Sequence, residues 1–252
     1  MCANLFSIDK ILKFDTLDST NDFAYELLKE NNIQNETIIW SINQKKGRGQ
    51  KGNKWLSENG KNLTFSIIYF PQNLINPLNQ FILNQTVTLA IIDFLKKELP
   101  DETPKIKWPN DIYIAKNKIS GILIENQILG SNIQSSIIGV GININQTEFP
   151  KEILNPTSLK LLTGIDYSIE NILKKLCFNF GIRFNQLIDK KIETIKSEFL
   201  ENLLYLNEIR DYYFNNNLIR AKITGLSENG KLQLISEDKI ITADFKEITF
   251  IH

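Results

Sequence analysis

The chain of 252 residues is 42% hydrophobic and 23% charged, a globular balance that excludes a disordered or fibrous protein and suffices for one large domain and a small one. Its 29 Lys and Arg residues equal its 29 Asp and Glu residues, so no net charge draws it to nucleic acid or to an anionic membrane. No apolar run approaches the roughly 18 residues that span a bilayer, no secretory signal opens the chain, and the two cysteines, Cys2 and Cys177, fit a reducing compartment. We therefore expect a soluble, cytoplasmic protein with no nucleic-acid or membrane partner.

Hydrophobic periodicity predicts an α+β chain that ends in a small β unit. Residues 79–99 give the clearest helix, since apolar side chains recur at helical spacing until a proline ends it. In chain order we expect a strand at 11–15, a helix at 21–30, strands at 37–42 and 62–70, a helix at 79–99, strands at 105–108, 112–115, 119–127 and 136–144, helices at 168–187 and 191–206, and strands at 218–225, 231–235, 240–245 and 248–251. The last four strands, with an Asn-Gly hairpin signal at 229–230, fit a small β-barrel or sandwich. We therefore predict a catalytic domain over 1–206 and a β domain over 207–252.

The side chains available for catalysis are restricted. The only histidine is His252, the last residue, which excludes Ser-His-Asp and Cys-His catalysis and His-rich metal sites within one chain. Catalysis must rely on Lys, Arg, Asp, Asn, backbone N–H groups or a metal that a ligand brings, and this inventory suits phosphate chemistry. Only four of the 29 basic residues are Arg, yet Arg48 lies within a glycine cluster, where its bidentate fork favours carboxylate or phosphate recognition.

That glycine cluster is the strongest local signal. Gly47, Gly49 and Gly52 fall within six positions, and residues 44–55 hold five basic side chains and no acidic one. The loop is therefore a positive focus suited to an anion. It also matches G-x-G-x-x-G, but a strand follows instead of the long helix that a dinucleotide fold requires, so that interpretation fails. A solvated basic hairpin loop is the alternative.

A second cluster lies on a predicted strand-turn-strand unit and is formed by Lys107-Trp108-Pro109-Asn110-Asp111, followed by Lys118, Gly121 and Glu125. Two lysines and one carboxylate converge on this unit. Lysine neutralises charge that develops on a phosphoryl group, and aspartate orients or deprotonates an amine. A hairpin with surface lysines is the alternative interpretation.

Two weaker signals stand at other strand and helix ends. Gly139-Val140-Gly141 permits a ligand or backbone to approach a strand closely, and Asn143 offers an amide to a base edge. Ser19-Thr20-Asn21 caps the helix that follows, and capping alone accounts for these residue types. A glycine-bulged strand and a plain N-cap are the alternatives, so the interpretation depends on the order in which all four signals occur.

In this order and spacing the motifs resemble the biotin–protein ligases, also called biotin–[acetyl-CoA-carboxylase] ligases (EC 6.3.4.15). The resemblance rests on the Ser-Thr-Asn turn, Gly-Arg-Gly-x-x-Gly-x-x-Trp, Lys-Trp-Pro-Asn-Asp, Lys-x-x-Gly-Ile-Leu-x-Glu and Gly-x-Gly-Ile-Asn, and covers nearly the whole chain. It implies an α+β fold: a mixed sheet packed with helices, related to class II aminoacyl-tRNA synthetases, followed by a small C-terminal SH3-like β-barrel. It also implies that biotin and MgATP form biotinyl-5′-AMP and pyrophosphate, and that a lysine of a biotin carboxyl carrier protein then takes the biotin and releases AMP.

The resemblance implies three overlapping sets of site residues. The biotin-binding set is Ser19, Thr20, Asn21, Gln44, Gly47, Arg48, Gly49, Gln50, Lys118 and Gly121. The set for ATP and the adenylate is Arg48, Trp55, Lys107, Asn110, Lys118 and Asn143. The catalytic set is Arg48, Lys107, Asp111 and Lys118. Magnesium travels on the ATP phosphates, and no protein ligand is assigned to it.

Several features separate this chain from parts of the family. Gln50 stands where several members carry Arg, which replaces a charged group near the adenylate by a neutral one. The ligase motifs begin at residue 19, so we expect a form without the N-terminal DNA-binding domain and without repressor function.

Lipoate–protein ligase, which shares the fold and the adenylate chemistry, is the nearest alternative, and a catalytically silent biotin-binding module is the other. Monomer and homodimer are both compatible with the sequence, since an exposed strand edge can support a side-by-side dimer. Cys177 lies in an apolar helical pattern and is expected in the core.

Overall fold

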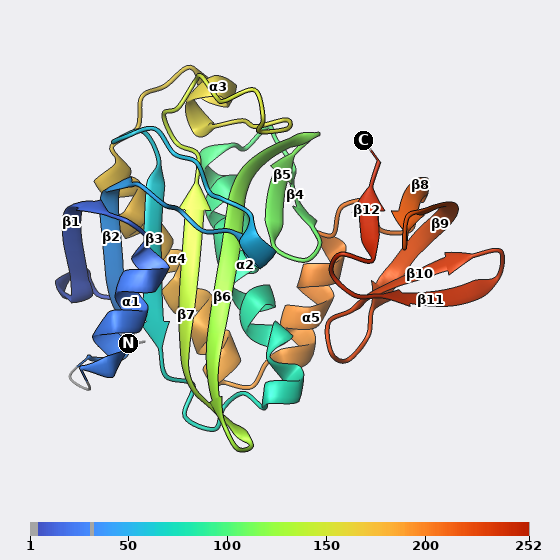
Figure 1. The fold of residues 1–252 in the computed structure, drawn as a ribbon, viewed down its shortest axis with the longest axis horizontal. Coiled ribbons are helices and arrows are strands. Elements are labelled where there is room, and N and C mark those ends of the chain that lie inside the picture. Colours follow the sequence, from blue (N-terminus) through green and yellow to red (C-terminus); the bar gives the residue numbers. More distant parts are fainter. Residues whose placement is uncertain (1–4, 31–32, 252) are drawn as a thin grey trace.

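A seven-stranded mixed sheet forms the larger part of the molecule (Figure 1). The computed structural model describes residues 5–30 and 33–251, so Cys2 and His252 lie outside the described residues. The strand order is β1-β2-β3-β7-β6-β5-β4, with β1 parallel to β2 and the other neighbouring pairs antiparallel. The strands are β1 (Ile11–Leu17), β2 (Thr37–Gln44), β3 (Leu63–Tyr69), β4 (Pro104–Lys107), β5 (Asp111–Ile114), β6 (Asn117–Leu129) and β7 (Asn132–Ile142).

Helices cover both faces of this sheet (Figure 1). α1 (Thr20–Lys29) lies on one face, α2 (Phe81–Glu98) and α4 (Ile169–Ile188) lie on the other, and α5 (Ile192–Glu201) packs against α2. Because side chains alternate along a strand, neighbouring residues of the central strands enter separate cores. The core under α1 takes Ile39, Ile68 and Ile137, and the core under α2 and α4 takes Ile38, Ile67 and Ile138.

The helix α2 is buried on almost every side because the sheet, α4 and α5 surround it. Its buried hydroxyls are satisfied by the helix itself, since Thr86 and Thr88 each donate to the carbonyl oxygen four residues earlier, at 2.8 and 2.7 Å. Arg183 of α4 joins the three helices: its guanidinium binds both carboxylate oxygens of Asp93 in α2, at 2.5 and 2.8 Å, and also pairs with Glu198 in α5. This buried arginine fixes the helical layer that supports the sheet.

The C-terminal part is a five-stranded antiparallel sheet in the order β11-β10-β9-β8-β12. Its strands are β8 (Ile209–Phe214), β9 (Asn217–Leu226), β10 (Leu232–Ser236), β11 (Lys239–Ala243) and β12 (Ile248–Phe250). Within the described residues the edge strands β11 and β12 do not pair with each other, so the predicted SH3-like barrel is not closed by hydrogen bonds. This sheet lies beside α5 and the β4–β5 end of the larger sheet (Figure 1). Trp108, in the turn between β4 and β5, donates its indole N–H to the carbonyl of Gly230 at 2.9 Å.

Each predicted element has a counterpart, with three differences. The helix predicted to reach residue 206 ends at Glu201, because the chain then turns to pair its backbone with β4 and adopts positive φ at Tyr205 and Asn207. Strand β8 occupies part of 207–217, where no strand was predicted, and the short helix α3 (Leu159–Thr163) was also missed. The division into domains at 206/207 stays a prediction.

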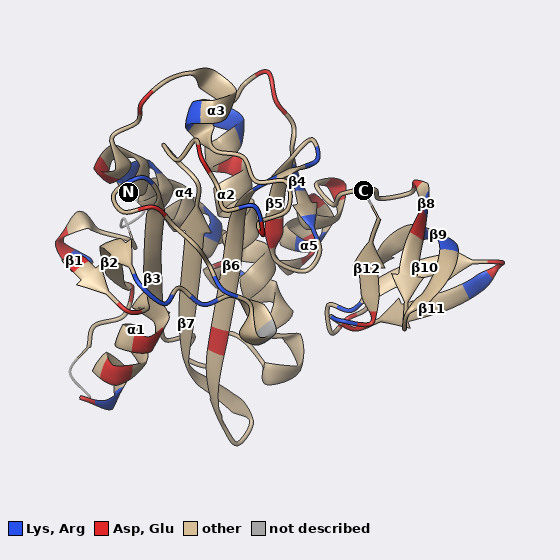
Figure 2. Cartoon of the chain, turned by 45° about the horizontal axis from the view of Figure 1, so that its top comes forward, with Lys and Arg blue, Asp and Glu red and all other residues tan. Residues whose placement is uncertain are grey.

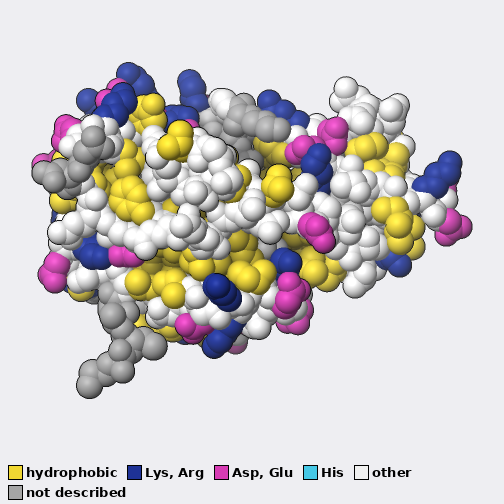
Figure 3. Space-filling model, turned by 90° about the horizontal axis from the view of Figure 1, so that it is seen from below, with side chains coloured by type: hydrophobic (Ala, Val, Ile, Leu, Met, Phe, Trp, Pro, Cys, Tyr) yellow, Lys and Arg dark blue, Asp and Glu magenta, His cyan; other side chains and the backbone are white. Residues whose placement is uncertain are grey.

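The surface carries charges of both signs, which are interspersed over the two sheets and their helices (Figure 2). Seen from below, hydrophobic side chains reach the surface in patches between charged ones (Figure 3). No helix within residues 5–30 and 33–251 has the length and apolar composition to cross a membrane.

Candidate active site

A cavity of about 280 Å³ opens between the first turn of α1, the glycine loop (residues 47–55), the turn between β4 and β5, and the strand β12. It therefore collects side chains from segments far apart in the sequence. Of the predicted site residues, all except Gly47 and Asn143 line it: Ser19, Thr20, Asn21, Gln44, Arg48, Gly49, Gln50, Trp55, Lys107, Asn110, Asp111, Lys118 and Gly121.

Hydroxyl and amide groups form the end of the cavity at α1. Ser19 caps the helix, its Oγ accepting a backbone N–H of the first turn at 3.3 Å. Thr20 donates through its backbone N–H and its hydroxyl to Oε1 of Gln44, at 2.9 and 3.1 Å. Ser66 Oγ of β3 lies 2.7 Å from Oγ1 of Thr20 and 2.6 Å from Oδ1 of Asn21. Ser66, which sequence reasoning missed because it lies in a uniformly buried strand, orients this polar end.

The glycine loop folds back on itself as a narrow hairpin. The N–H of Trp55 donates to the carbonyl of Gly47 at 2.9 Å, and the N–H of Gly49 donates to the carbonyl of Asn53 at 2.8 Å. A Cβ on Gly47 would lie 2.3 Å from the carbonyl oxygen of Trp55, so glycine is required there by close backbone approach. The loop lies over the cavity, whereas the alternative interpretation predicted a basic hairpin loop exposed to solvent.

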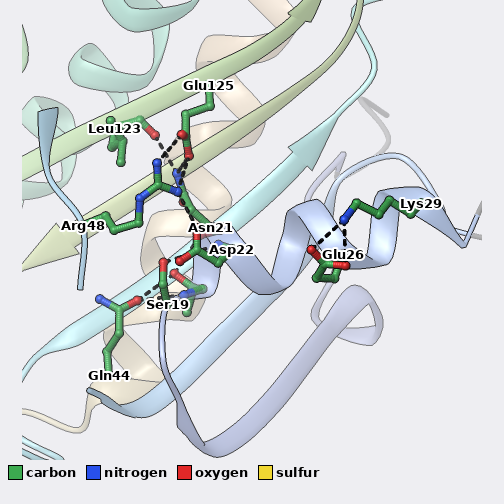
Figure 4. Close-up of polar contacts among 11 residues, drawn as sticks. Ser19, Asn21, Asp22, Glu26, Lys29, Gln44, Arg48, Leu123 and Glu125 are labelled. Carbon is green, nitrogen blue, oxygen red and sulfur yellow. Dashed lines mark hydrogen bonds and ion pairs between the residues drawn. The ribbon is translucent and has the colours of Figure 1, made fainter. Parts of the chain in front are cut away.

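Arg48 is held by the protein's own carboxylates (Figure 4). Its NH2 donates to Oε1 of Glu125 at 2.6 Å, and its NH1 pairs with Asp22 of α1. Glu125 also accepts a hydrogen bond from Nδ2 of Asn21 at 2.8 Å. We expected Arg48 to face a ligand anion and placed Glu125 in the second cluster, with Lys118 and Gly121, rather than beside Arg48.

Two lysines supply positive charge on the opposite side. Nζ of Lys118 lies 2.7 Å from Oδ1 of Asp111. Nζ of Lys107 lies 3.3 Å from the hydroxyl of Tyr113 and 5.5 Å from the ring centroid of Phe250. Burial lowers the pKa of Lys107, a shift that nearby Asp111 opposes. The predicted strand-turn-strand unit thus places two ammonium groups and one carboxylate together.

Trp55 separates this cavity from a smaller one of about 80 Å³. Its ring covers Gly141, where a Cβ would lie 2.3 Å from Cε2, and Gly121, where a Cβ would lie 3.1 Å from Cζ3. Lys54, Trp55 and Lys118 line both cavities. The indole Nε1 of Trp55 is buried without a hydrogen-bond partner among the described residues, which leaves a donor for a ligand.

The predicted asparagines mainly fix local structure. Asn143 lines the smaller cavity and donates its amide to the carbonyl of Thr157 at 2.9 Å. The side-chain amide of Asn110 donates to the carbonyl of Ile122 at 2.6 Å, and the backbone carbonyl of Asn110 accepts the N–H of Ile122 at 3.1 Å. Both side chains thereby hold the turns that carry the lysines and the carboxylate.

A family model described as the Biotin/lipoate A/B protein ligase family matches residues 13–143. The chain belongs to this family. The bifunctional ligase/repressor BirA of Bacillus subtilis is 29% identical over 242 residues, which cover 94% of this chain and 73% of that protein. The biotin–[acetyl-CoA-carboxylase] ligase of Paracoccus denitrificans is 30% identical over 128 residues, which cover 50% of this chain and 51% of that protein. A structure of the biotin protein ligase from Aquifex aeolicus in complex with biotin and ATP matches with a TM-score of 0.78 and 30% identity, over 95% of this chain and 97% of that chain.

One wall of the cavity in this biotin/lipoate ligase comes from the C-terminal sheet. The contributing side chains are Phe245, Ile248, Thr249 and Phe250. The ring of Phe245 lies 6.4 Å from that of Trp108, centroid to centroid. Sequence reasoning assigned these residues to a separate β domain, and no local signal could have linked them to the site.

Cys177 of this ligase lies in α4 and is 2% exposed, as the apolar pattern predicted. Burial raises the pKa of its thiol to about 12. The thiol is therefore protonated at neutral pH. Cys177 is not among the residues that line the cavity.

Proposed function

We propose that this chain is a biotin–protein ligase that uses ATP to attach biotin, through biotinyl-5′-AMP, to a lysine of a biotin carboxyl carrier protein. The observation that carries the proposal is the junction at Lys118, where a cavity with a polar end adjoins a second cavity behind Trp55. Two ligands that must react with each other need such adjoining sites with a cation between them. The likeness to a biotin ligase in complex with biotin and ATP supports this assignment.

The polar end at α1 suits the ureido ring of biotin, because hydroxyl and amide groups of Thr20, Asn21 and Gln44 form neutral hydrogen bonds there. The biotin carboxylate then points toward Lys118. The nucleoside occupies the smaller cavity beside Asn143 and Trp55, and its binding requires this space of about 80 Å³ to widen. This placement brings the biotin carboxylate and the α-phosphate of ATP to the ammonium group of Lys118.

In the first step a biotin carboxylate oxygen attacks the α-phosphorus of ATP. The bond from that phosphorus to the oxygen bridging the β-phosphate breaks, and pyrophosphate leaves with its magnesium, which enters as part of MgATP. Lys118 and Lys107 offset the negative charge that spreads over the phosphoryl oxygens. Burial leaves the Lys107 ammonium group weakly solvated, which lowers its pKa and also strengthens its attraction to an anion.

In the second step the carrier lysine's amine attacks the carbonyl carbon of the mixed anhydride. The bond from that carbon to the phosphate oxygen breaks, and AMP leaves. Asp111, 2.7 Å from Lys118, accepts the proton that the amine loses. The glycine loop and the wall at Phe250 shield the anhydride from water between the two steps.

The test is exchange of labelled pyrophosphate into ATP, measured with biotin, lipoate and octanoate in parallel. Exchange with biotin alone, followed by labelling of a biotin carrier domain, is the expected result. Exchange with lipoate would assign the chain to the lipoate ligases of the same family. No exchange with any acid, together with measurable biotin binding, would establish a silent biotin-binding module.

We further propose a cytoplasmic location, from the two cysteines of the sequence, and action without a nucleic-acid partner. We also propose a homodimer through the exposed edge of β1, which pairs only with β2 among the described strands. Sedimentation equilibrium tests it, and a monomer at all concentrations would contradict it.

A further inference from the structure

The Arg48 cluster, formed by Arg48, Asp22, Glu125 and Asn21, joins three separate segments at the edge of the cavity (Figure 4). Arg48 comes from the glycine loop, Asp22 and Asn21 from the first turn of α1, and Glu125 from β6. Glu125 is shared: Oε1 lies 2.6 Å from NH2 of Arg48, and Oε2 lies 2.8 Å from Nδ2 of Asn21 and 3.3 Å from NH1 of Arg48. One carboxylate thus contacts two of the proposed biotin-binding residues.

The charges of the cluster disfavour a ligand anion at Arg48. One guanidinium faces two carboxylates, so the cluster carries a net negative charge before any ligand arrives. Both terminal nitrogens already donate to protein oxygens. In the proposed function, the positive charge for the phosphates comes instead from Lys107 and Lys118, which also line the cavity.

Glu125, and Asn21 which binds it, are fixed more firmly than the loop that carries Arg48, whereas the Asp22 side chain is 53% exposed. Glu125 lies in β6, opposite Ile137 of β7 in the middle of the sheet. Asn21 is 4% exposed and is held by Ser66 at 2.6 Å. The two hydrogen bonds of the hairpin described above join loop residues only to each other, so the Arg48 side chain ties the hairpin to the sheet and to α1.

We propose that Glu125, assisted by Asp22, is a positioning residue: it holds Arg48 and thereby keeps the glycine loop in place over the cavity before a ligand binds. Arg48 acts as the anchor of the loop and keeps its carboxylate partners when biotin is bound. The effect of Glu125 on biotin affinity rests on the proposed function, whereas its effect on the loop does not.

Limited trypsin digestion without ligand tests the loop directly, because residues 45–54 contain five Lys and Arg cleavage sites. Glu125→Gln removes the charge and keeps the shape and an acceptor for Asn21. We expect cleavage within 45–54 to accelerate by about fivefold, since the open population rises when a pair of this kind is lost. Glu26→Gln is the matched control, because Glu26 pairs with Lys29 on the same helix, away from the loop (Figure 4). Equal cleavage of the two variants and the wild-type chain would overturn the proposal.

Calorimetric titration with biotin then distinguishes two roles for Arg48, an anchor of the loop or a receptor for a ligand anion. The two roles predict opposite changes in the Kd for biotin in Glu125→Gln. If Arg48 anchors the loop, Glu125→Gln raises the Kd for biotin at least about twofold, because a smaller fraction of the protein is competent to bind. The double variant Arg48→Gln/Glu125→Gln is then no weaker than Arg48→Gln alone. If Arg48 must leave Glu125 to bind the ligand, Glu125→Gln lowers the Kd, and the anchor proposal is wrong. A wild-type chain that binds no biotin would remove the proposed function while the digestion result still stands.

Discussion

Replacing Gly141 by alanine should disable the site through Trp55. The added Cβ would lie 2.3, 2.6 and 2.7 Å from three atoms of the indole ring, whereas ordinary contacts begin at 3.4 Å. The ring must therefore withdraw by about 1.1 Å. At Gly121, the other glycine beneath the ring, the added Cβ would lie 3.1 Å from the nearest ring atom, so alanine there displaces the ring by only about 0.3 Å. Alanine at Gly121 also comes within 3.3 Å of Cε and Nζ of Lys118, so it slightly crowds that lysine as well as the ring.

The expected effect on stability is modest and that on activity is large. Overpacking costs about 1–3 kcal/mol, and because the ring sits on a loop that can shift, we expect about 1 kcal/mol for Gly141→Ala. In a chain of this size that lowers the Tm by about 2–4 °C. Displacing a positioning group by about 1 Å lowers turnover by about 100-fold, so pyrophosphate exchange should fall by about that factor.

The assays are thermal unfolding and biotin-dependent pyrophosphate exchange on Gly141→Ala and Gly121→Ala. Adding Trp55→Leu to Gly141→Ala should recover the Tm and leave exchange low, because the clash disappears and so does the partition between the cavities. Wild-type exchange by Gly141→Ala would refute the assignment of Trp55 to this partition.

Three further substitutions test other parts of the structure. Lys118→Ala should reduce pyrophosphate exchange by at least about 100-fold and leave biotin binding measurable by calorimetry, since it removes the cation at the junction of the cavities; near-normal exchange would contradict that role. Gln50→Arg should slow the release of biotinyl-AMP in a stopped-flow chase by adding a charged fork at the cavity; an unchanged rate would place residue 50 outside the ligand contacts. Arg183→Met should lower the free energy of unfolding, measured in urea, by about 3 kcal/mol. The reason is that Asp93 and Glu198 lose their partner, and Arg183 is only 8% exposed. A loss below about 1 kcal/mol would show that α2, α4 and α5 are held together by apolar packing alone.

Local patterns were sufficient for most of the secondary structure. The segments 62–70 and 136–144 read as buried strands because apolar side chains fill them, and both pair in the centre of the sheet. Strand β8 was missed because charged residues interrupt Ile209–Phe214. The last helix, α5, was predicted too long because its end is set by backbone pairing of the following residues with β4. Periodicity carries no information about a partner strand's hydrogen bonds.

The glycines show the same limit at the site. Gly139-Val140-Gly141 predicted close approach to a strand, and the structure identifies what approaches: Asn21 at one glycine and Trp55 at the other. The pattern indicated the space but not its occupant, because both side chains come from distant segments of the chain.

The sequence by itself determined the kinds of group in the candidate site and their order: a helix cap, a basic glycine loop, two lysines with an aspartate, and a small-residue strand. These follow from residue type and local spacing, which act over a few positions. Only the tertiary structure decided which groups face each other. Arg48 meets Glu125, 77 residues away, and the C-terminal wall at Phe250 closes a cavity that begins at Ser19. Such contacts depend on strand order and on the packing of the two sheets, and a charge in the sequence does not reveal which opposite charge the fold brings to it.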